Sequence, residues 1–143
     1  MKLTSPVFEN NGIIPQKYTC QGNNINPPLM IRNIPNGTVS LALIIDDPDA
    51  PMKTWDHWVM WNIKPVAEIP ENSALGEQGK NSWGNNHYGG PCPPNGTHRY
   101  FFKLYALDCD LNLSRKATKL DLEAAMENHI LESVNLIGLY QKV

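Results

Sequence analysis

The segment from Val39 to Ile45 is apolar at every position except Ser40. A strand that is exposed on one face alternates apolar and polar residues, so an unbroken apolar run is typical of a strand buried on both faces. Such a strand has to be covered by other elements on each side. The run therefore predicts a layered, β-rich fold.

Three further segments have strand character, and one segment near the carboxyl end is helical in pattern. The predicted strands are Trp58–Ile63, which Pro65 ends, the aromatic-rich run Tyr100–Leu107, and a closing strand Val134–Tyr140 that Gly138 weakens. Thr118 and Asp121 have the spacing of a capping box at a helix start. The helical face that follows is predicted to contain Leu122, Ala125, Met126, His129 and Ile130, which makes His129 a buried structural residue.

Long connections separate these elements, because the 12 prolines and 10 glycines cluster between them. The longest connection runs from Glu71 to Asn95 and contains no clear regular element. A loop of this length in a compact domain is usually functional or disordered, and its Trp83, Tyr88 and prolines favour order.

The overall composition excludes several classes of protein. A chain of 143 residues predicts one domain, 1–143, and a net charge of −2 gives no basic surface for nucleic acid. No apolar run approaches the ~20 residues that a membrane span needs. The first residues, Met1 to Pro6, lack the apolar stretch of a signal peptide, which predicts a cytoplasmic protein.

Three cysteines, Cys20, Cys92 and Cys109, show no C-x-x-C spacing and are too few for a structural zinc site. In a reducing compartment, free thiols are the main expectation. A Cys20–Cys92 bridge is the alternative, if the chain comes from a hyperthermophile.

Ionisable residues gather where the predicted strands begin or end. Asp47 directly follows the first buried strand, His57 opens the next, and His98 and Tyr100 open the third. The i, i+2 spacing puts His98 and Tyr100 on one face. If the three strands are neighbours, these four side chains meet at one rim.

Two histidines, a phenol and the free N–H groups of a Gly89-Gly90 turn would suit a small anion such as phosphate. Asp47 is expected to accept a hydrogen bond from a histidine ring, which fixes the tautomer and helps to keep that ring positively charged.

Other readings of these residues stay open. Asp47 would also cap a turn, and His98 and Tyr100 would also serve as hydrogen-bonded core residues. The tryptophans are expected in the core and the pocket wall rather than in a cofactor site, so no cofactor is predicted. The position of His87, in the pocket or in solvent, is undecided.

Enzymatic readings are weaker than binding readings. A divalent metal held by Asp47, Asp49, His57 and His98, or acid–base catalysis by a His/Asp pair, is the minor alternative. The chain has no Gly-x-Ser-x-Gly, His-Glu-x-x-His or phosphate-binding Walker motif, and no nucleophile stands out. We therefore expect neither a resident metal nor an enzyme.

Several segments together resemble the phosphatidylethanolamine-binding proteins, also called Raf kinase inhibitor-like proteins, in their short prokaryotic branch. The matching segments cover nearly the whole chain: Ile14-Pro15, Tyr18–Cys20, Pro27–Leu29, Asp47–Pro51, His57–Val59, Gly89–Tyr100, Ala124–Glu127 and Gly138–Tyr140.

The resemblance implies a mainly β fold with short helices, in which a central antiparallel sheet packs with a smaller sheet and one helix lies near the carboxyl end. It also implies a pocket for phosphate, phosphorylethanolamine or acetate-like groups. The ligand-binding positions carried over are Asp47, Pro51, Trp55, His57, Gly90, Pro94, His98 and Tyr100.

Members of this family include inhibitors of serine proteases and of kinases, which predicts a non-catalytic inhibitor, most plausibly of a serine protease. The loop from Glu71 to Asn86, with Leu75 or Trp83 as specificity residue, is the candidate contact. The alternative is a sensor or carrier of phosphorylated small molecules without a protein target. A homodimer is also compatible with the short branch.

Overall fold

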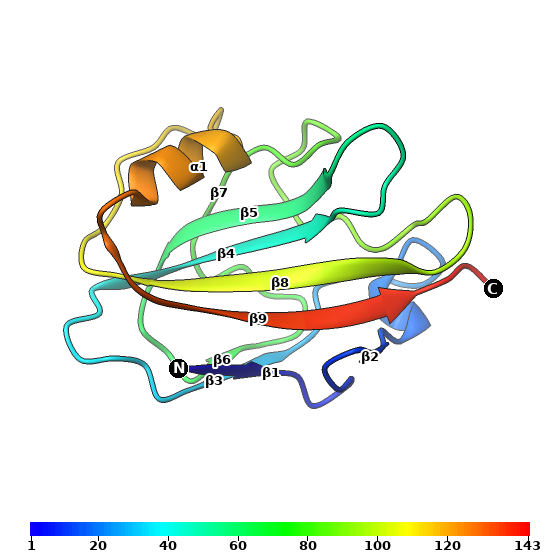
Figure 1. Cartoon of the computed structure of the whole chain (residues 1–143), viewed down its shortest axis with the longest axis horizontal. Helices are drawn as coiled ribbons and strands as arrows, with labels where there is room; N and C mark the ends of the chain where they lie inside the picture. Colours follow the sequence, from blue (N-terminus) through cyan, green and yellow to red (C-terminus); the bar gives the residue numbers. More distant parts are fainter.

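The computed structural model describes all 143 residues, and its strands form two sheets that face each other across the main core (Figure 1). The larger sheet has the order β2-β9-β8-β4-β5-β7 and the smaller one β1-β3-β6. The elements are β1 (Lys2–Thr4), β2 (Gly12–Ile13), the 3-10 helix η1 (Gln16–Tyr18), β3 (Leu29–Arg32), β4 (Ser40–Asp47), β5 (Trp55–Ile63), β6 (Glu68–Ile69), β7 (Glu77–Gln78), β8 (His98–Leu107), α1 (Lys119–Met126) and β9 (Ile130–Tyr140).

Strand pairing in both sheets is antiparallel, except for the two-residue β2, which runs parallel to β9. The predicted mainly β fold, with a central antiparallel sheet, a smaller sheet and one helix near the carboxyl end, is confirmed. The central strands are longer than predicted. β4 continues to Asp47, β5 begins at Trp55 and β8 begins at His98, so the ionisable residues lie inside the sheet.

Strand β4 is buried at all eight positions, as its apolar run predicts. Leu41, Leu43 and Ile45 point into the core between the two sheets. Ala42 and Ile44 point the other way and pack with residues of α1, which covers the opposite face of the large sheet (Figure 1). The two-sided burial therefore comes from a small sheet on one side and a single helix on the other.

Helix α1 begins as the capping box predicts, because the Asp121 carboxylate accepts the Thr118 backbone N–H at 2.9 Å. The helix ends at Met126, and Asn128 has a φ of 68° that turns the chain out of the helix. The prediction that His129 and Ile130 continue the buried face is therefore wrong. His129 is half-exposed and binds Asp108 at 2.8 Å, while Ile130 starts β9.

Strand β9 contains Gly138 in its interior, where a glycine normally weakens a strand. A Cβ at this position would lie 2.5 Å from the Ile14 side chain and 3.0 Å from Phe8. The glycine is needed here because the segment around β2 packs directly on the backbone of β9.

The connection from Glu71 to Asn95 contains one short strand, β7, that its composition does not predict, and is otherwise irregular as expected. No helix in the structure combines the length and the apolarity needed to cross a membrane.

Candidate functional site

The end of β4 and the starts of β5 and β8 lie at the same end of the large sheet, because β4 is antiparallel to both neighbours. Three loops extend beyond the strands at this end, on the right in Figure 1: the β4–β5 connection, the long connection that precedes β8 and the turn after η1. Together they enclose a cavity of about 630 Å³, which is the size of a pocket for a small molecule.

All eight residues predicted as ligand-binding line this one cavity: Asp47, Pro51, Trp55, His57, Gly90, Pro94, His98 and Tyr100. His87, whose place was undecided, also lines it and remains exposed. Cys20 and Asn24 also line the cavity, and the sequence did not predict this. They come from the turn after η1, and nothing in their local sequence indicates that this turn reaches the far end of the sheet.

Asp47 and His98 form a buried pair across the neighbouring strands β4 and β8. The Nδ1 atom of His98 lies 2.7 Å from Asp47 Oδ2, so the predicted carboxylate–histidine contact is present. The second oxygen, Oδ1, accepts the backbone N–H of Asp49 at 2.8 Å. Both carboxylate oxygens are thus used within the protein, and the Nε2 atom of His98 has no partner.

His57 is held differently, by a backbone carbonyl. Its Nδ1 lies 2.7 Å from the Gly89 oxygen, and the Gly89 N–H donates back to the His57 carbonyl at 3.1 Å. Burial of the ring lowers the pKa of His57, against the opposing influence of this hydrogen bond and of Asp47. The expectation of charged histidines in the pocket is therefore wrong for His57.

The Gly89-Gly90 turn does not offer the free N–H groups that the sequence predicts. The Gly89 N–H is used by His57, and the Gly90 N–H donates to Asn24 Oδ1 at 2.8 Å. A Cβ at Gly90 would lie 2.4 Å from the same Asn24 oxygen and 2.5 Å from the Tyr18 carbonyl. Gly90 is needed for this close approach of two backbone segments.

Two buried donors on residues that line the cavity make no hydrogen bond, the Trp55 indole Nε1 and the Tyr100 hydroxyl, although the Asp47 side chain and the Cys92 backbone lie close to that hydroxyl. Burial, together with the nearby charge of Asp47, raises the pKa of Tyr100, which keeps the phenol protonated. Since buried polar groups are nearly always paired in native proteins, these two donors are candidates for binding a ligand.

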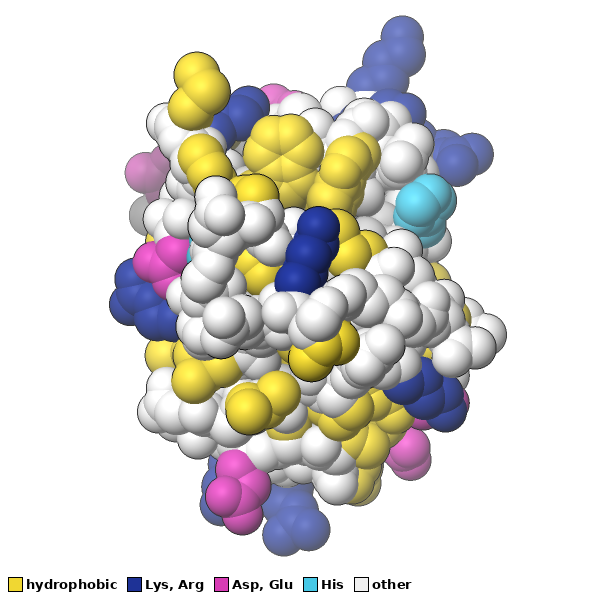
Figure 2. Space-filling view, turned by 90° about the vertical axis from the view of Figure 1, so that its right-hand side faces the viewer, with side chains coloured by type: hydrophobic (Ala, Val, Ile, Leu, Met, Phe, Trp, Pro, Cys, Tyr) yellow, Lys and Arg dark blue, Asp and Glu magenta, His cyan; other side chains and the backbone are white.

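The rest of the cavity wall is largely aromatic. The Trp83 ring stands edge-on to Trp55 and to His57, with ring centroids 5.5 and 5.0 Å apart, and Lys53 Nζ lies 5.8 Å from the Trp55 ring. In the view of this end of the molecule, hydrophobic side chains surround a hollow and most charged side chains stay at the periphery (Figure 2). The cavity is thus an apolar pocket with a few polar groups.

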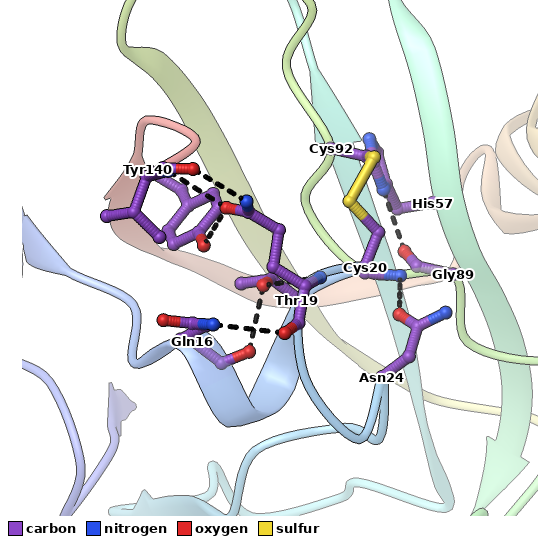
Figure 3. The surroundings of a disulfide bond; sticks show 11 residues. Gln16, Thr19, Cys20, Asn24, His57, Gly89, Cys92 and Tyr140 are labelled. Atoms are coloured by element: carbon purple, nitrogen blue, oxygen red, sulfur yellow. Dashed lines mark hydrogen bonds between the residues drawn. A yellow bond between two sulfur atoms is a disulfide. The ribbon is translucent and has the colours of Figure 1, made fainter.

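A disulfide between Cys20 and Cys92 joins two walls of the cavity (Figure 3). The expectation of free thiols is therefore wrong for these two residues and holds only for Cys109. The same two segments are also joined by the hydrogen bond from Cys20 N–H to the Pro91 carbonyl, at 3.1 Å. The alternative that the sequence left open, a Cys20–Cys92 bridge between residues 72 positions apart, is the one that the structure contains.

The four residues of the predicted metal alternative do not come together. Asp49 lies outside the cavity lining and binds the Arg99 guanidinium at 2.8 and 2.9 Å, which lowers the pKa of Asp49 to about 2. A separate group of metal-ligand types, Asp108, Cys109 and His129, lies beyond the other end of β8. The hydrogen bond between Asp108 and His129 is enough to explain why the ligand atoms of this group lie close together.

The family model of phosphatidylethanolamine-binding protein matches residues 4–141 of the chain. A UPF0098 protein of Pyrococcus horikoshii is 50% identical over 149 residues, which cover 96% of this chain and 75% of the relative. A UPF0098 protein of Methanothermobacter thermautotrophicus is 49% identical over 150 residues, which cover 99% of this chain and 99% of the relative.

Solved structures agree with this assignment. A phosphatidylethanolamine-binding protein homologue of Chlamydia trachomatis superimposes with a TM-score of 0.95 at 40% identity, covering 99% of this chain and 97% of the homologue. YbcL of Escherichia coli, described as a new member of the mammalian family, has a TM-score of 0.91 at 25% identity, with 99% and 98% covered. The matched model, the relatives and the fold establish that this chain belongs to the phosphatidylethanolamine-binding protein family.

Proposed function

We propose that this chain is a non-catalytic binding protein whose cavity takes a small anion of the phosphate type. The observation that carries the proposal is the pair of unpartnered buried donors at the cavity wall, Trp55 Nε1 and Tyr100 Oη. An oxyanion offers several acceptor oxygens to such donors at once. The name of the family refers to a lipid with a phosphate-bearing headgroup, which is in line with this chemistry.

The negative charge of Asp47 in the cavity does not rule out the binding of an anion there. Both oxygens of Asp47 accept hydrogen bonds from within the protein, from His98 and from the Asp49 backbone. The Nε2 atom of His98 remains without a partner within the protein. Lys53 places a positive charge 5.8 Å from the ring of Trp55, which lines the cavity.

Calorimetry with phosphorylethanolamine tests this proposal. Tyr100→Phe removes one unpartnered donor and is expected to weaken binding about fivefold or more. Tyr105→Phe is the matched control, because Tyr105 lies on the opposite face of β8. Absence of binding at millimolar ligand, or equal affinities for the two variants, would count against the pocket as an anion site.

Inhibition of a serine protease is a second candidate, favoured by the segment around Leu75. Leu75 is 38% exposed, and the segment is held at Asn72 and Ser73 by hydrogen bonds to Asn26 and at β7 by pairing with β5. An exposed side chain on a fixed loop is the arrangement that suits insertion into a protease cleft. Trp83 is the weaker candidate, because it packs against Trp55 and His57.

Assays with chymotrypsin-, elastase- and trypsin-type proteases address this second candidate. Leu75→Gly is expected to raise the inhibition constant about tenfold or more. Met52→Gly, at a fully exposed position with a φ of 73°, is expected to leave it unchanged. If no protease is inhibited at micromolar protein while phosphorylethanolamine still binds, the chain is better described as a sensor or carrier. Hydrolysis in phosphatase or esterase screens that is lost in Asp47→Ala would instead favour the metal- or His/Asp-dependent alternative.

A further inference from the structure

The hydrogen bond of His57 determines which of its ring nitrogens carries a proton. A backbone carbonyl only accepts hydrogen bonds, so the 2.7 Å contact with the Gly89 oxygen requires a proton on His57 Nδ1. The reciprocal bond from Gly89 N–H to the His57 carbonyl holds the two residues in register. Whenever the ring is neutral, Nε2 therefore has a bare lone pair.

The surroundings of the ring favour this neutral form. His57 is 3% exposed, and the rings of Trp83 and Tyr100 stand edge-on to it at 5.0 and 5.2 Å. The pKa of His57 is lowered by this burial. No protein group is bonded to Nε2, and the residue lines the cavity, so a neutral His57 offers an acceptor to whatever enters.

His98 has a different role in the same cavity. Its Nδ1 faces the carboxylate of Asp47 rather than a backbone carbonyl, so a negative charge lies beside this ring. The cavity thus contains one histidine bonded to a carbonyl and one bonded to a carboxylate.

We propose that the cavity selects oxyanions that carry their own proton, with His57 Nε2 accepting the hydrogen bond of a P–O–H group; this inference rests on the anion-binding function proposed above. Inorganic phosphate has such a proton at every pH near neutrality. A phosphate monoester has one only below its second pKa of about 6. Sulfate has none, and its oxygen would face an unpaired buried acceptor, which lowers affinity.

Several other titratable groups face the cavity, and their protonation has to be separated from that of the ligand. These groups are Asp47 from β4, His98 and Tyr100 from β8, His87 from the long connection before β8, and Lys53 near the Trp55 ring. Any gain of positive charge among them strengthens the binding of every anion. Sulfate is therefore the internal control, because it reports protein charging without ligand protonation.

The test is calorimetry of the full chain with inorganic phosphate, methyl phosphate and sulfate, at pH about 8 and about 5.5, on either side of the monoester pKa. At the higher pH, inorganic phosphate is expected to bind about tenfold or more tightly than the other two ligands. At the lower pH, methyl phosphate is expected to gain about tenfold relative to sulfate.

Two results would overturn the inference while leaving anion binding intact: equal affinities for phosphate and sulfate at high pH, or an equal gain for sulfate and methyl phosphate on acidification. The second result would mean that histidine charging governs affinity. Failure of all three ligands and of phosphorylethanolamine to bind would reject the proposed function as well.

A variant pair assigns the selectivity to His57. His57→Gln is expected to bring the phosphate-to-sulfate affinity ratio close to one, whereas His129→Gln, at the opposite end of the sheet, keeps the wild-type ratio. If His57→Gln does not fold, the ring nitrogen chemical shifts of His57 in the wild-type protein show whether Nε2 binds the ligand. A neutral Nδ1–H ring whose Nε2 resonance moves with phosphate but not with sulfate supports the inference, and a doubly protonated ring in the phosphate complex contradicts it.

Discussion

Asp46 and Asp47 are consecutive in β4 and therefore point to opposite faces of the large sheet. Asp47 reaches the cavity and accepts a hydrogen bond from His98. Asp46 reaches the helix side, where Lys103 and Lys119 bind it at 2.8 and 3.1 Å. Two identical side chains thus have different roles, one in the cavity and one in attaching the helix to the sheet. They differ because successive side chains of a strand point to opposite faces of the sheet.

At the residue scale, His57 makes the stability of the fold dependent on pH. Its pKa is lower in the folded protein than the ordinary value of about 6.5, so the unfolded chain takes up a proton first as pH falls. The stabilisation is complete above about pH 6.5 and is lost as pH falls toward the folded pKa. Urea unfolding at several pH values is expected to show this loss in the wild-type protein.

The His57→Gln variant should have a flatter dependence of unfolding free energy on pH over the same interval. His129→Gln is the control, since His129 is half-exposed and far from the cavity. An unchanged pH dependence in His57→Gln would show that the burial of this ring is not the source of the effect.

At the scale of elements, α1 is attached to the sheet by apolar and ionic contacts together. Leu122 and Met126 are buried against residues of β4 and β5. Lys119, at the first turn of the helix, bridges Asp46 of β4 and Asp56 of β5 at 3.1 and 3.2 Å. The ionic contact lies at the start of the helix and fixes its position over the sheet.

Neutralising the buried carboxylate of this contact should loosen the helix. Asp46→Asn is expected to lower the free energy of unfolding by about 2 kcal/mol, because Asp46 is only 1% exposed and its two lysine partners lose their counter-charge. Asp49→Asn breaks a more exposed pair with Arg99 and is expected to cost less than about 1 kcal/mol. Urea denaturation of both variants checks the difference, and equal losses would contradict this ranking.

At the scale of the whole molecule, the Cys20–Cys92 disulfide links the amino-terminal part of the chain to the connection that precedes β8. The linked residues are 72 positions apart, so the bond closes a long loop in the unfolded chain. It also fixes two walls of the cavity relative to each other. Stability and ligand affinity are therefore expected to depend on the same bond.

Replacing both cysteines, in Cys20→Ser/Cys92→Ser, is expected to lower the free energy of unfolding by about 4 kcal/mol on the chain-entropy estimate. Reducing agent should destabilise the wild-type protein by a similar amount and leave the double variant unchanged. Cys109→Ser should respond to reducing agent as the wild type does. Phosphorylethanolamine affinity unchanged by reduction would mean that the hydrogen bonds between the walls suffice.

A homodimer stays a prediction, and the edges of the large sheet bear on its geometry. The edge strands β2 and β7 are two residues long and pair only with Gly138–Leu139 of β9 and with Met60–Trp61 of β5, so most of the outer side of β9 has no strand partner. A dimer that pairs this part of β9 with a second copy is therefore compatible with the fold. Light scattering on a size-exclusion column measures the mass against 16.1 kDa for one chain.

The amino-acid sequence by itself determined the features that depend on local pattern. The apolar run around Ile44 predicted a strand buried on both faces, and the Thr118–Asp121 pair predicted the start of α1, because burial period and capping are properties of neighbouring residues. The eight residues predicted to bind a ligand line one cavity, and their binding role stays a prediction. Positions at strand ends predicted that Asp47, His57, His98 and Tyr100 meet, and the family resemblance added the others.

The tertiary structure alone decided the features that depend on partners remote in the sequence. It ended α1 before His129, paired Cys20 with Cys92, and assigned the N–H of Gly90 to Asn24 rather than to a ligand. It also set the direction in which the pKa of His57 shifts, because burial lowers this pKa against the opposing influence of the carbonyl of Gly89, 32 residues away. Hydrogen-bond partners and solvent exposure are set by packing between segments, and no local pattern encodes them.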